Sequence, residues 1–310
     1  VVRMKIIKAV VGVLRNESGQ LLIAKRQDHQ FMAGFWELPG GKVEPQESDQ
    51  EAIIRELQEE LGIVATSLSL HQTMVYQYTD RIIELGIYNI DNYRNIPKGA
   101  EGQEISWTAI KNLNHYKLLP TMSAFINSIT LPNKYWITPS SNHQSDEWMR
   151  KFDEKMTQDI SLVQLRAKTE LPTDFVENLY KKCKQNHVKL LLNTVGKTFN
   201  ETHCDGWHLT TGEMLKLTQK PCTDDKLLGA STHNLEEALT AQKLGADFVV
   251  ISPVQATQTH PDTIPIGWEI AKEVVNKLNI PVYFLGGMSL NDLDKTLKLG
   301  AQGIAGVSAF

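Results

Sequence analysis

Residues 135–307 repeat one pattern eight times: a short apolar run, followed by a stretch in which apolar residues recur with helical spacing. Short apolar runs that alternate with helical segments are typical of parallel strands buried on both faces. Eight such units are the number that closes a (β/α)8 TIM barrel, so we predict this barrel for residues 135–310. The eight runs are Tyr135–Thr138, Leu162–Leu165, Lys189–Leu192, Trp207–Leu209, Leu227–Ala230, Asp247–Ser252, Pro281–Leu285 and Gly303–Val307.

The first 130 residues have a different sequence pattern. The clearest helix runs from Ser48 to Leu61, because Ser48 and Glu51 form a capping-box pair and Gly62 terminates the helical pattern. A short break at Leu131–Lys134 separates the two patterns, so we predict an α/β domain over residues 1–130, a linker over residues 131–134 and the barrel over residues 135–310. The other expected elements are strands at Ile6–Leu14, Leu21–Lys25, Phe35–Leu38, Met74–Tyr78, Arg81–Ile90 and around Trp107, an irregular stretch at Asp91–Gly102 and a helix at Pro120–Ile129.

The charge of the chain is nearly balanced in both halves. Residues 1–130 hold 13 Lys and Arg against 15 Asp and Glu, and the remainder holds 19 against 21. Neither half is a basic platform, so we expect a nucleotide-sized ligand and no long nucleic acid. No apolar run is long enough to span a bilayer, and the three cysteines have no metal or redox spacing. We therefore expect no membrane partner and a cytoplasmic protein with reduced thiols.

Three acidic side chains share one face of the expected helix. Glu56, Glu59 and Glu60 stand at positions i, i+3 and i+4, and an apolar stripe at Ile53 and Leu57 lies on the adjoining face. Like charges packed so closely raise one another's pKa, so the arrangement is unfavourable unless a cation lies among them. Hard oxygen ligands favour Mg²⁺ or Mn²⁺, which also bind phosphate oxygens.

A solvated acidic helix is the alternative interpretation of such a pattern, and by itself the ExxEE spacing favours that alternative. Here a larger set of positions agrees. Five residues separate Gly41 from Glu47 and seven more precede Arg55, and glycines flank the acidic segment on both sides. The segment matches the Nudix box, Gx5Ex7REUxEExGU, without a departure. Residues 5–130 resemble the MutT branch of the Nudix hydrolases, the 8-oxo-dGTP diphosphatases.

The Nudix resemblance implies a fold and a reaction. The fold would be an α/β/α sandwich with a mixed sheet, in which the box forms loop, helix and loop. The reaction would be attack of a metal-activated water on the β-phosphorus of a nucleoside triphosphate, which releases a nucleoside monophosphate and pyrophosphate. For this chain the expected substrate is 8-oxo-dGTP, in nucleotide-pool sanitation and DNA repair, with Mg²⁺ as cofactor and Mn²⁺ as a substitute.

Residue roles follow from the same resemblance. Glu56, Glu59 and Glu60 correspond to the metal ligands, joined by the Gly40 carbonyl. Arg55 would orient Glu56, and Glu47 would brace the loop. In the segment Lys98–Gly102, Glu101 resembles the distant carboxylate that binds metal and acts as general base; an exposed loop acid is the alternative interpretation.

The residues expected to contact the nucleoside depart from the family pattern. Arg26 resembles a family arginine near the nucleotide. Leu38 stands where the family has a phenylalanine, and Tyr78 is a conservative replacement of a second family phenylalanine. The Asp-Asn pair that reads the oxidised guanine falls on Thr121-Met122. Methionine can pack on a base but cannot donate and accept hydrogen bonds as asparagine does, so we expect less sharp base discrimination.

The second half resembles thiamine-phosphate synthase and its relative TenI over nearly its whole length. By this resemblance Gln164, Arg166, Lys168 and Asn193 would hold a pyrimidine pyrophosphate. Thr257, Gly286, Gly287 and Ser308 would surround a thiazole phosphate, and Ser231 is a further expected substrate-binding residue of the barrel. We therefore expect a thiamine-precursor phosphate as the barrel ligand, because backbone donors in a glycine loop suit phosphate. The pieces that match are Tyr135–Thr138, Gln164–Lys168, Asn193, Asp205–Leu209, Gly229–His233, Gly286–Met288 and Val307–Ala309.

Three departures weaken the case for a synthase. An Asn-Asp pair of the family is Asn193-Thr194 here, a second metal-binding Asp corresponds at best to Glu213, and a Thr-Lys pair is Thr259-His260. Losing a metal ligand and a fixed positive charge weakens the step that expels pyrophosphate. We therefore expect a degenerate, phosphate-binding barrel of the tautomerase or sensing kind, with an active synthase and a purely structural partner as alternatives. His233 is either an acid/base of such a barrel or a residue that caps a helix.

Three classes of function remain for the whole chain. The first is a nucleotide-pool hydrolase fused to a degenerate barrel. The second is a thiamine-pathway protein whose Nudix half clears thiamine-type pyrophosphates. The third is a non-catalytic ligand sensor, which the intact set of carboxylates argues against. We therefore favour the first class.

Overall fold

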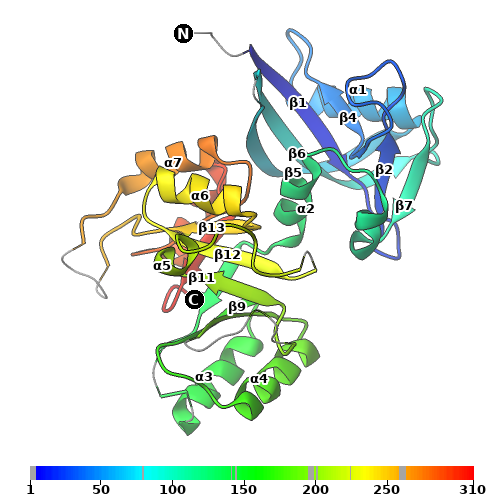
Figure 1. Ribbon diagram of the computed structural model, residues 1–310. Helices are drawn as coiled ribbons and strands as arrows, with labels where there is room; N and C mark the ends of the chain where they lie inside the picture. The colour runs from blue at the N-terminus through cyan, green and yellow to red at the C-terminus, as the bar shows by residue number, and fades with distance from the viewer. Residues whose placement is uncertain are drawn as a thin grey trace. The chain divides into compact units, whose positions relative to one another are not determined.

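The computed structural model describes residues 5–78, 80–140, 142–143, 145–194, 199, 202–223, 225–257 and 263–310 (Figure 1). The chain forms two compact units, Val1–Ile129 and Thr130–Phe310. Within the described residues no helix has both the length and the apolar character needed to cross a membrane.

The N-terminal unit contains two sheets, with strand orders β4-β1-β6-β5 and β3-β2-β7. Strands β1 and β6 run parallel and the other pairs run antiparallel, which makes the first sheet mixed. The strands are β1 (Lys5–Val13), β2 (Leu21–Lys25), β3 (Trp36–Glu37), β4 (Gly40–Lys42), β5 (Val64–Gln77), β6 (Arg81–Arg94) and β7 (Ile105–Thr108), and the helices are α1 (Asp49–Leu61), the short η1 (Ile110–His115) and α2 (Met122–Thr130).

Helices α1 and α2 cover opposite faces of the mixed sheet. Neighbouring residues of a strand point to opposite faces, and in β1 Val10 and Val11 belong to different cores. Val10 packs in the cluster that contains Ile53 of α1, whereas Val11 packs in the cluster that contains Phe125 of α2. The expected α/β/α sandwich is thereby confirmed.

Helix α1 begins and ends where its local signals indicate. Ser48 and Glu51 form both hydrogen bonds of the capping box, and Gly62 ends the helix with a φ of +67°. Ile53 and Leu57 are fully buried, as the apolar stripe predicts. The stripe anchors the helix and leaves its acidic face directed away from the core.

Strands β5 and β6 are longer than expected. The segment expected to be irregular begins at Asp91, but β6 continues to Arg94 and pairs with β5 back to Val64. The register of this pair shifts between Ala65 and Ser67, between Ser67 and Leu68, and between Leu70 and Gln72. Each shift interrupts the alternation of inward and outward side chains. The sequence of the strand therefore lacks the regular period-two pattern from which a strand is predicted.

The C-terminal unit is a closed barrel of eight parallel strands, as the eight apolar runs predict. The strands are β8 (Lys134–Ile137), β9 (Leu162–Ala167), β10 (Lys189–Thr194), β11 (Gly206–Leu209), β12 (Leu227–Thr232), β13 (Phe248–Ile251), β14 (Val282–Phe284) and β15 (Gly303–Gly306). The helices are α3 (Asp146–Met156), α4 (Thr173–Gln185), α5 (Thr211–Met214), α6 (Leu235–Leu244), α7 (Gly267–Lys277), the short η2 (Leu290–Asp292) and α8 (Leu293–Lys298).

The segment expected to be a linker, Leu131–Lys134, is part of the barrel. Leu131 is only 4% exposed and lies in the same core cluster as Tyr283, whose side chain is fully buried. Gln302 Nε2 donates to the Leu131 carbonyl at 2.7 Å, and the Tyr283 hydroxyl donates to the carbonyl of Pro132. These contacts correct the predicted linker, because the segment closes one end of the barrel core.

Candidate functional site

Two glycines bring strand β4 directly against the acidic face of α1. A Cβ on Gly41 would lie 2.3 Å from the carboxylate of Glu56, so only glycine leaves room for that carboxylate. Gly40 has a φ of +145°, and a Cβ there would lie 2.1 Å from the Val10 carbonyl oxygen of β1. The Gly40 N–H donates to Glu60 Oε2 at 3.0 Å. The strand backbone therefore forms one wall of the site.

Arg55 connects three carboxylates. Its Nε and Nη2 donate to the two oxygens of Glu47 at 2.8 and 2.9 Å, which is a bidentate pair. Its Nη1 donates to Glu56 Oε1 and Glu59 Oε2, each at 3.0 Å. The hydrogen bonds that Arg55 donates to Glu47 lower the pKa of Glu47 to about 2, and the same hydrogen bonds raise the pKa of Arg55. This geometry suits the expected roles, in which Arg55 orients Glu56 and Glu47 holds Arg55.

Among the carboxyl groups of the site, Glu60 has a strongly raised pKa. Burial, with the charges of Glu37, Glu56 and Glu101, raises its pKa to about 8, although the Gly40 N–H opposes the shift. Burial also raises the pKa of Glu56, against the lowering effect of Arg55. Among the described residues Glu60 has no ion pair. A nearby cation, which the described side chains do not supply, would stabilise its ionised form and lower its pKa.

The loop after β6 is fastened to the end of α1. The Ala100 N–H and Gln103 Nε2 both donate to the Glu60 carbonyl, at 2.8 and 2.6 Å. Gln27 Nε2 donates to the Glu101 carbonyl at 2.7 Å. The Glu101 charge consequently raises the pKa of both Glu56 and Glu60. Gln27 and Gln103 were not predicted from the sequence, because neither belongs to a spaced motif.

The donor set suits a hard divalent cation, although the side chains do not already form a cage. Within the described residues no group of three His, Cys, Asp or Glu side chains is arranged to hold a metal ion. Glu59, half-exposed, is paired with Arg55 instead. Glu56 and Glu60 are oxygen donors, the Glu56 charge raises the pKa of Glu60, and Glu60 has no ion pair among the described residues. That combination fits Mg²⁺ better than a softer metal.

The residues expected near the nucleoside divide into two groups. Arg26 forms an ion pair with Glu37 and donates through Nε to the Phe31 carbonyl at 2.6 Å. Tyr78 is half-buried and its side chain hydrogen-bonds with that of Thr121. Burial raises the pKa of Tyr78, its hydrogen bond with Thr121 opposes the shift, and the nearby charges of Glu37 and Arg26 act on it in opposite directions. The Glu37 charge also reaches Glu60. A polar row thus runs from the carboxylates to Tyr78.

Leu38 and Met122 do not belong to that row. Leu38 is 1% exposed, Met122 is fully buried, and both lie in the core cluster on the α2 side of the sheet. We expected both to contact the base, and this is corrected here. The inward face of α2 carries Met122 into the core, so it stabilises the fold and offers no surface to a ligand.

Most residues expected at the barrel site lie near the carboxyl ends of its strands or in the loops that follow, whereas Gln164 lies within β9 and is only 4% exposed. Gln164 and Arg166 belong to β9, Asn193 to β10 and Ser231 to β12, whereas Lys168, Thr257 and Ser308 lie in loops. Gly286 and Gly287 have φ values of +92° and +66°. A Cβ on either would collide with the loop after β13, at 2.6 Å from Pro253 or 2.4 Å from the Ala256 carbonyl oxygen. Thr259 and His260 lie outside the described residues.

Two further barrel residues are engaged in local structure. Glu213 Oε2 accepts hydrogen bonds from the backbone and the hydroxyl of Thr210, at 2.8 and 2.9 Å, which closes a capping box at the start of α5. His233 donates from its backbone N–H to Glu237 Oε2 at 2.7 Å, and its Nδ1 lies 3.1 Å from the same oxygen. These contacts favour the helix-capping interpretation of His233.

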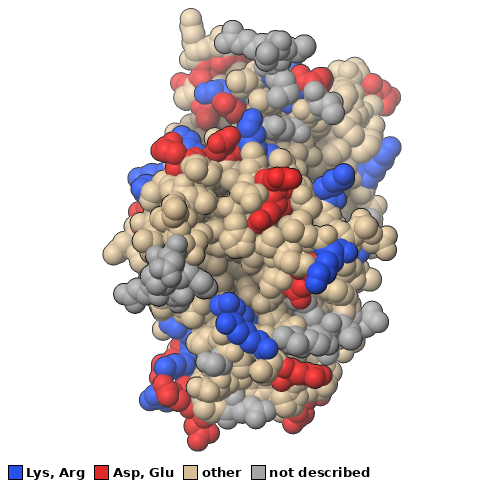
Figure 2. All heavy atoms as spheres, turned by 60° about the vertical axis from the view of Figure 1, so that its left-hand side comes forward, with Lys and Arg blue, Asp and Glu red and all other residues tan. Residues whose placement is uncertain are grey.

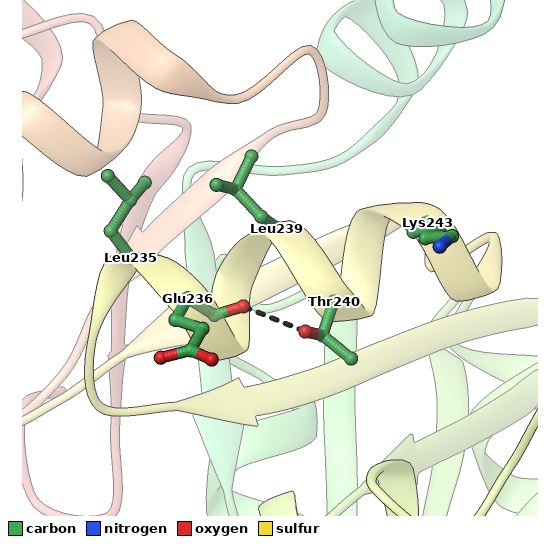
Figure 3. A pocket seen from close by; sticks show the side chains of 5 residues that line it. All are labelled: Leu235, Glu236, Leu239, Thr240 and Lys243. Atoms are coloured by element: carbon green, nitrogen blue, oxygen red, sulfur yellow. Dashed lines mark hydrogen bonds between the residues drawn. The ribbon is translucent and has the colours of Figure 1, made fainter.

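Two hollows lie elsewhere on the part of the chain that the structure describes. One hollow follows the outer face of α6, where Leu235 and Leu239 point to the same side (Figure 3). Another lies beside Phe175, between α3 and α4. Neither is lined by an expected site residue. On the face shown in Figure 2 the acidic and basic side chains of the described residues are interspersed.

Comparisons with known proteins follow the same division of the chain. A model described as NUDIX domain matches residues 10–128, and a model described as thiamine monophosphate synthase matches residues 134–310. The 8-oxo-dGTP diphosphatase of Escherichia coli is 38% identical over 36% of this chain and 86% of its own length. The CTP pyrophosphohydrolase of the same organism is 35% identical over 38% and 86%. The thiamine-phosphate synthase of Bacillus licheniformis is 30% identical over 57% and 82%. The chain is therefore a fusion that belongs to two families, with a Nudix hydrolase domain at its N-terminus and a thiamine monophosphate synthase family domain at its C-terminus.

Proposed function

We propose that the N-terminal unit hydrolyses nucleoside triphosphates to a nucleoside monophosphate and pyrophosphate, with 8-oxo-dGTP as preferred substrate and Mg²⁺ as cofactor. The observation that carries this proposal is the carboxylate cluster of Glu56, Glu60 and Glu101, in which burial and repulsion raise the pKa of Glu60 to about 8. Such a cluster is stabilised by a divalent cation, which in turn binds a polyphosphate. Similarity to 8-oxo-dGTP diphosphatases supports the choice of base. Hydrolysis of this nucleotide would keep an oxidised base out of DNA.

Glu56, Glu59, Glu60 and Glu101, with the Gly40 carbonyl, would hold the metal. When bound, Mg²⁺ would neutralise charge on the departing pyrophosphate and lower the pKa of a nearby water. Mn²⁺ shares the preference for hard oxygen donors and would substitute for it.

The side chains around the carboxylates position the reaction. Arg55 is fixed by its bidentate pair with Glu47, so the hydrogen bond from Arg55 to Glu56 holds that carboxylate in one orientation. Glu101, placed by the fastened loop, is the proposed general base that takes the proton of the attacking water. Arg26 and Tyr78 line the nucleoside side of the same polar row.

Steady-state kinetics with a panel of substrates test this function. Pyrophosphate release would be measured with 8-oxo-dGTP, dGTP, CTP and thiamine pyrophosphate in the presence of Mg²⁺, and kcat/KM should be highest for 8-oxo-dGTP. Glu56→Gln keeps the size of the side chain and removes its charge, and should lower kcat by about 100-fold or more. Glu17→Gln, an exposed carboxylate in a turn, is the matched control and should leave kcat unchanged.

Each contrary result of this panel has a separate meaning. Equal efficiency on 8-oxo-dGTP and dGTP would remove the sanitation role and leave the hydrolase. Preference for thiamine pyrophosphate would assign the unit to thiamine metabolism. Absence of turnover on every substrate would refute the hydrolase itself.

For the barrel we propose binding of a thiamine-precursor phosphate without synthesis of thiamine phosphate. The support is chemical: Thr194 offers no carboxylate, and the Glu213 carboxylate is used in the capping box of α5. Mixing the purified protein with the two phosphorylated thiamine precursors should therefore yield no thiamine phosphate. Robust synthesis that Arg166→Ala abolishes would contradict this proposal.

A further inference from the structure

Four polar side chains form a hydrogen-bonded line across the inside of the barrel. The Tyr135 hydroxyl of β8 donates to Gln164 Oε1 of β9 at 3.2 Å. The same hydroxyl oxygen lies 3.1 Å from His208 Nδ1 of β11, and His208 Nε2 lies 2.9 Å from Ser231 Oγ of β12. The line therefore joins four of the eight strands, and none of the expected roles requires Tyr135 or His208.

This line of hydrogen bonds runs from the buried core of the barrel to the end where we expect the ligand. Gln164, Tyr135 and His208 are 4%, 0% and 1% exposed, whereas Ser231, near the carboxyl end of β12, is partly exposed. Phe248 packs against both rings, with centroids 5.4 Å from Tyr135 and 6.2 Å from His208. The serine is thus the member of the line that a ligand can reach.

Glycine at position 229 creates the space for the imidazole. A Cβ there would lie 2.8 Å from His208 Nδ1 and 2.5 Å from the ring of Phe248. Asn193 Nδ2 also donates to the His208 carbonyl at 2.7 Å, which fixes the backbone of β11 at this point. The imidazole is therefore held in one place by its neighbours.

The direction of the hydrogen bonds determines the tautomer of His208. Burial raises the pKa of Tyr135 well above its usual value, so its hydroxyl keeps its single proton and donates it to Gln164. The Tyr135 oxygen can then only accept from His208, which requires a proton on Nδ1. In a neutral imidazole Nε2 is then unprotonated and accepts the Ser231 hydroxyl proton. A serine whose proton is bound by an imidazole nitrogen has its oxygen lone pairs available to a ligand.

We propose that His208 is a proton-relay residue that acts through Ser231 on the ligand bound in the barrel. This inference rests on the proposed binding of a phosphorylated ligand there. In the relay, Ser231 Oγ accepts a proton from an acidic group of the ligand while its own proton passes to His208 Nε2. The ligand is left as its conjugate base and His208 as an imidazolium that still donates through Nδ1 to Tyr135. The proton returns by the same path, so no electrons are exchanged and no other reactant is required.

Histidine nitrogen NMR on the full chain tests the relay. The protein would be labelled with ¹⁵N-histidine, and two-bond ¹H–¹⁵N spectra distinguish the Nδ1–H from the Nε2–H tautomer. His208→Gln identifies the His208 signals by their loss among nine histidines. We expect a neutral ring protonated on Nδ1, an Nε2 signal that shifts in Ser231→Ala, and little change in Ser231→Thr, which keeps the hydroxyl. Melting curves of the variants report whether the barrel is still folded.

Thiamine phosphate is the ligand probe, with inorganic phosphate as the control. Thiamine phosphate should shift the Nε2 signal of the wild-type protein and leave that of Ser231→Ala unchanged. Protonation on Nε2 in the free protein, or an Nε2 signal that ignores Ser231→Ala, would overturn the relay. The tautomer is measured without ligand, so its result decides the role of His208. Failure of calorimetry to detect thiamine phosphate binding would instead refute the ligand proposed for the barrel.

Discussion

Replacing Glu60 with glutamine should stabilise the metal-free protein at alkaline pH and remove its response to Mg²⁺. In the folded protein this carboxyl has a pKa of about 8, against 4.5 for an unperturbed glutamate. Between these values the folded state binds more protons than the unfolded state, so the free energy of unfolding falls as pH rises from 4.5 to 8. Glutamine keeps an oxygen for the Gly40 N–H and carries no charge, so it avoids this loss.

The size of the effect follows from the same pKa. The difference between the two pKa values, at about 1.4 kcal/mol per pKa unit, sets an upper bound of about 5 kcal/mol. Local relaxation and water entry reduce the cost of burying a charge, so we expect roughly 2–4 kcal/mol at pH 8.5. For a unit of this size that corresponds to a rise in Tm of roughly 6–12 °C. At pH 4, below both pKa values, the carboxyl is largely protonated in the folded and the unfolded state, so the difference should nearly vanish.

Differential scanning calorimetry in EDTA, repeated with Mg²⁺, measures both parts of this prediction. The wild-type transition of the N-terminal unit should move upward with Mg²⁺, because the cation binds the folded state. Glu60→Gln should start higher at pH 8.5 and move little, and Glu17→Gln should behave as the wild type. The reasoning is refuted if Glu60→Gln shows no gain at pH 8.5 in EDTA, or retains the full response to Mg²⁺.

Three other substitutions follow from particular contacts. Arg55→Lys should lower kcat by about 10-fold or more with a smaller change in KM, because a single ammonium cannot hold three carboxylates; an unchanged kcat in steady-state assays would argue against this. Leu131→Ala should destabilise the barrel by about 2–4 kcal/mol in urea unfolding, whereas Leu215→Ala, 59% exposed, should cost less than about 0.5 kcal/mol. Gly229→Ala should cost about 1–3 kcal/mol because its Cβ has no room, whereas Gly212→Ala, which meets nothing within 4 Å, should be tolerated; equal melting temperatures would contradict the packing.

The features predicted from the sequence are those that depend on neighbouring residues. The ends of α1 follow from Ser48, Glu51 and Gly62, which act within one helical turn. The barrel strands were predicted because each is a short apolar run of its own, and burial on both faces leaves no alternation to misread. The acidic face of α1 follows from spacing on a single helix.

The features that were missed depend on residues far apart in the chain. Leu131 lies in a segment with the composition of a break, but Tyr283 and Gln302, more than 150 residues later, draw it into the core. Gln27 reaches the loop that carries Glu101 across 74 residues, and an isolated glutamine gives no periodic signal. The burial of Met122 depends on which face α2 turns to the sheet, and resemblance to a family motif does not determine that face.

Electron paramagnetic resonance of Mn²⁺ titrated into the protein tests the central claim most directly, because it reports the cation and not the product. The wild-type protein should bind Mn²⁺ at the carboxylate cluster, and Glu56→Gln should weaken this binding by about 10-fold or more and lose hydrolysis in parallel. Glu17→Gln should leave the titration unchanged. Unchanged Mn²⁺ affinity in Glu56→Gln, together with undiminished nucleotide hydrolysis, would contradict the account.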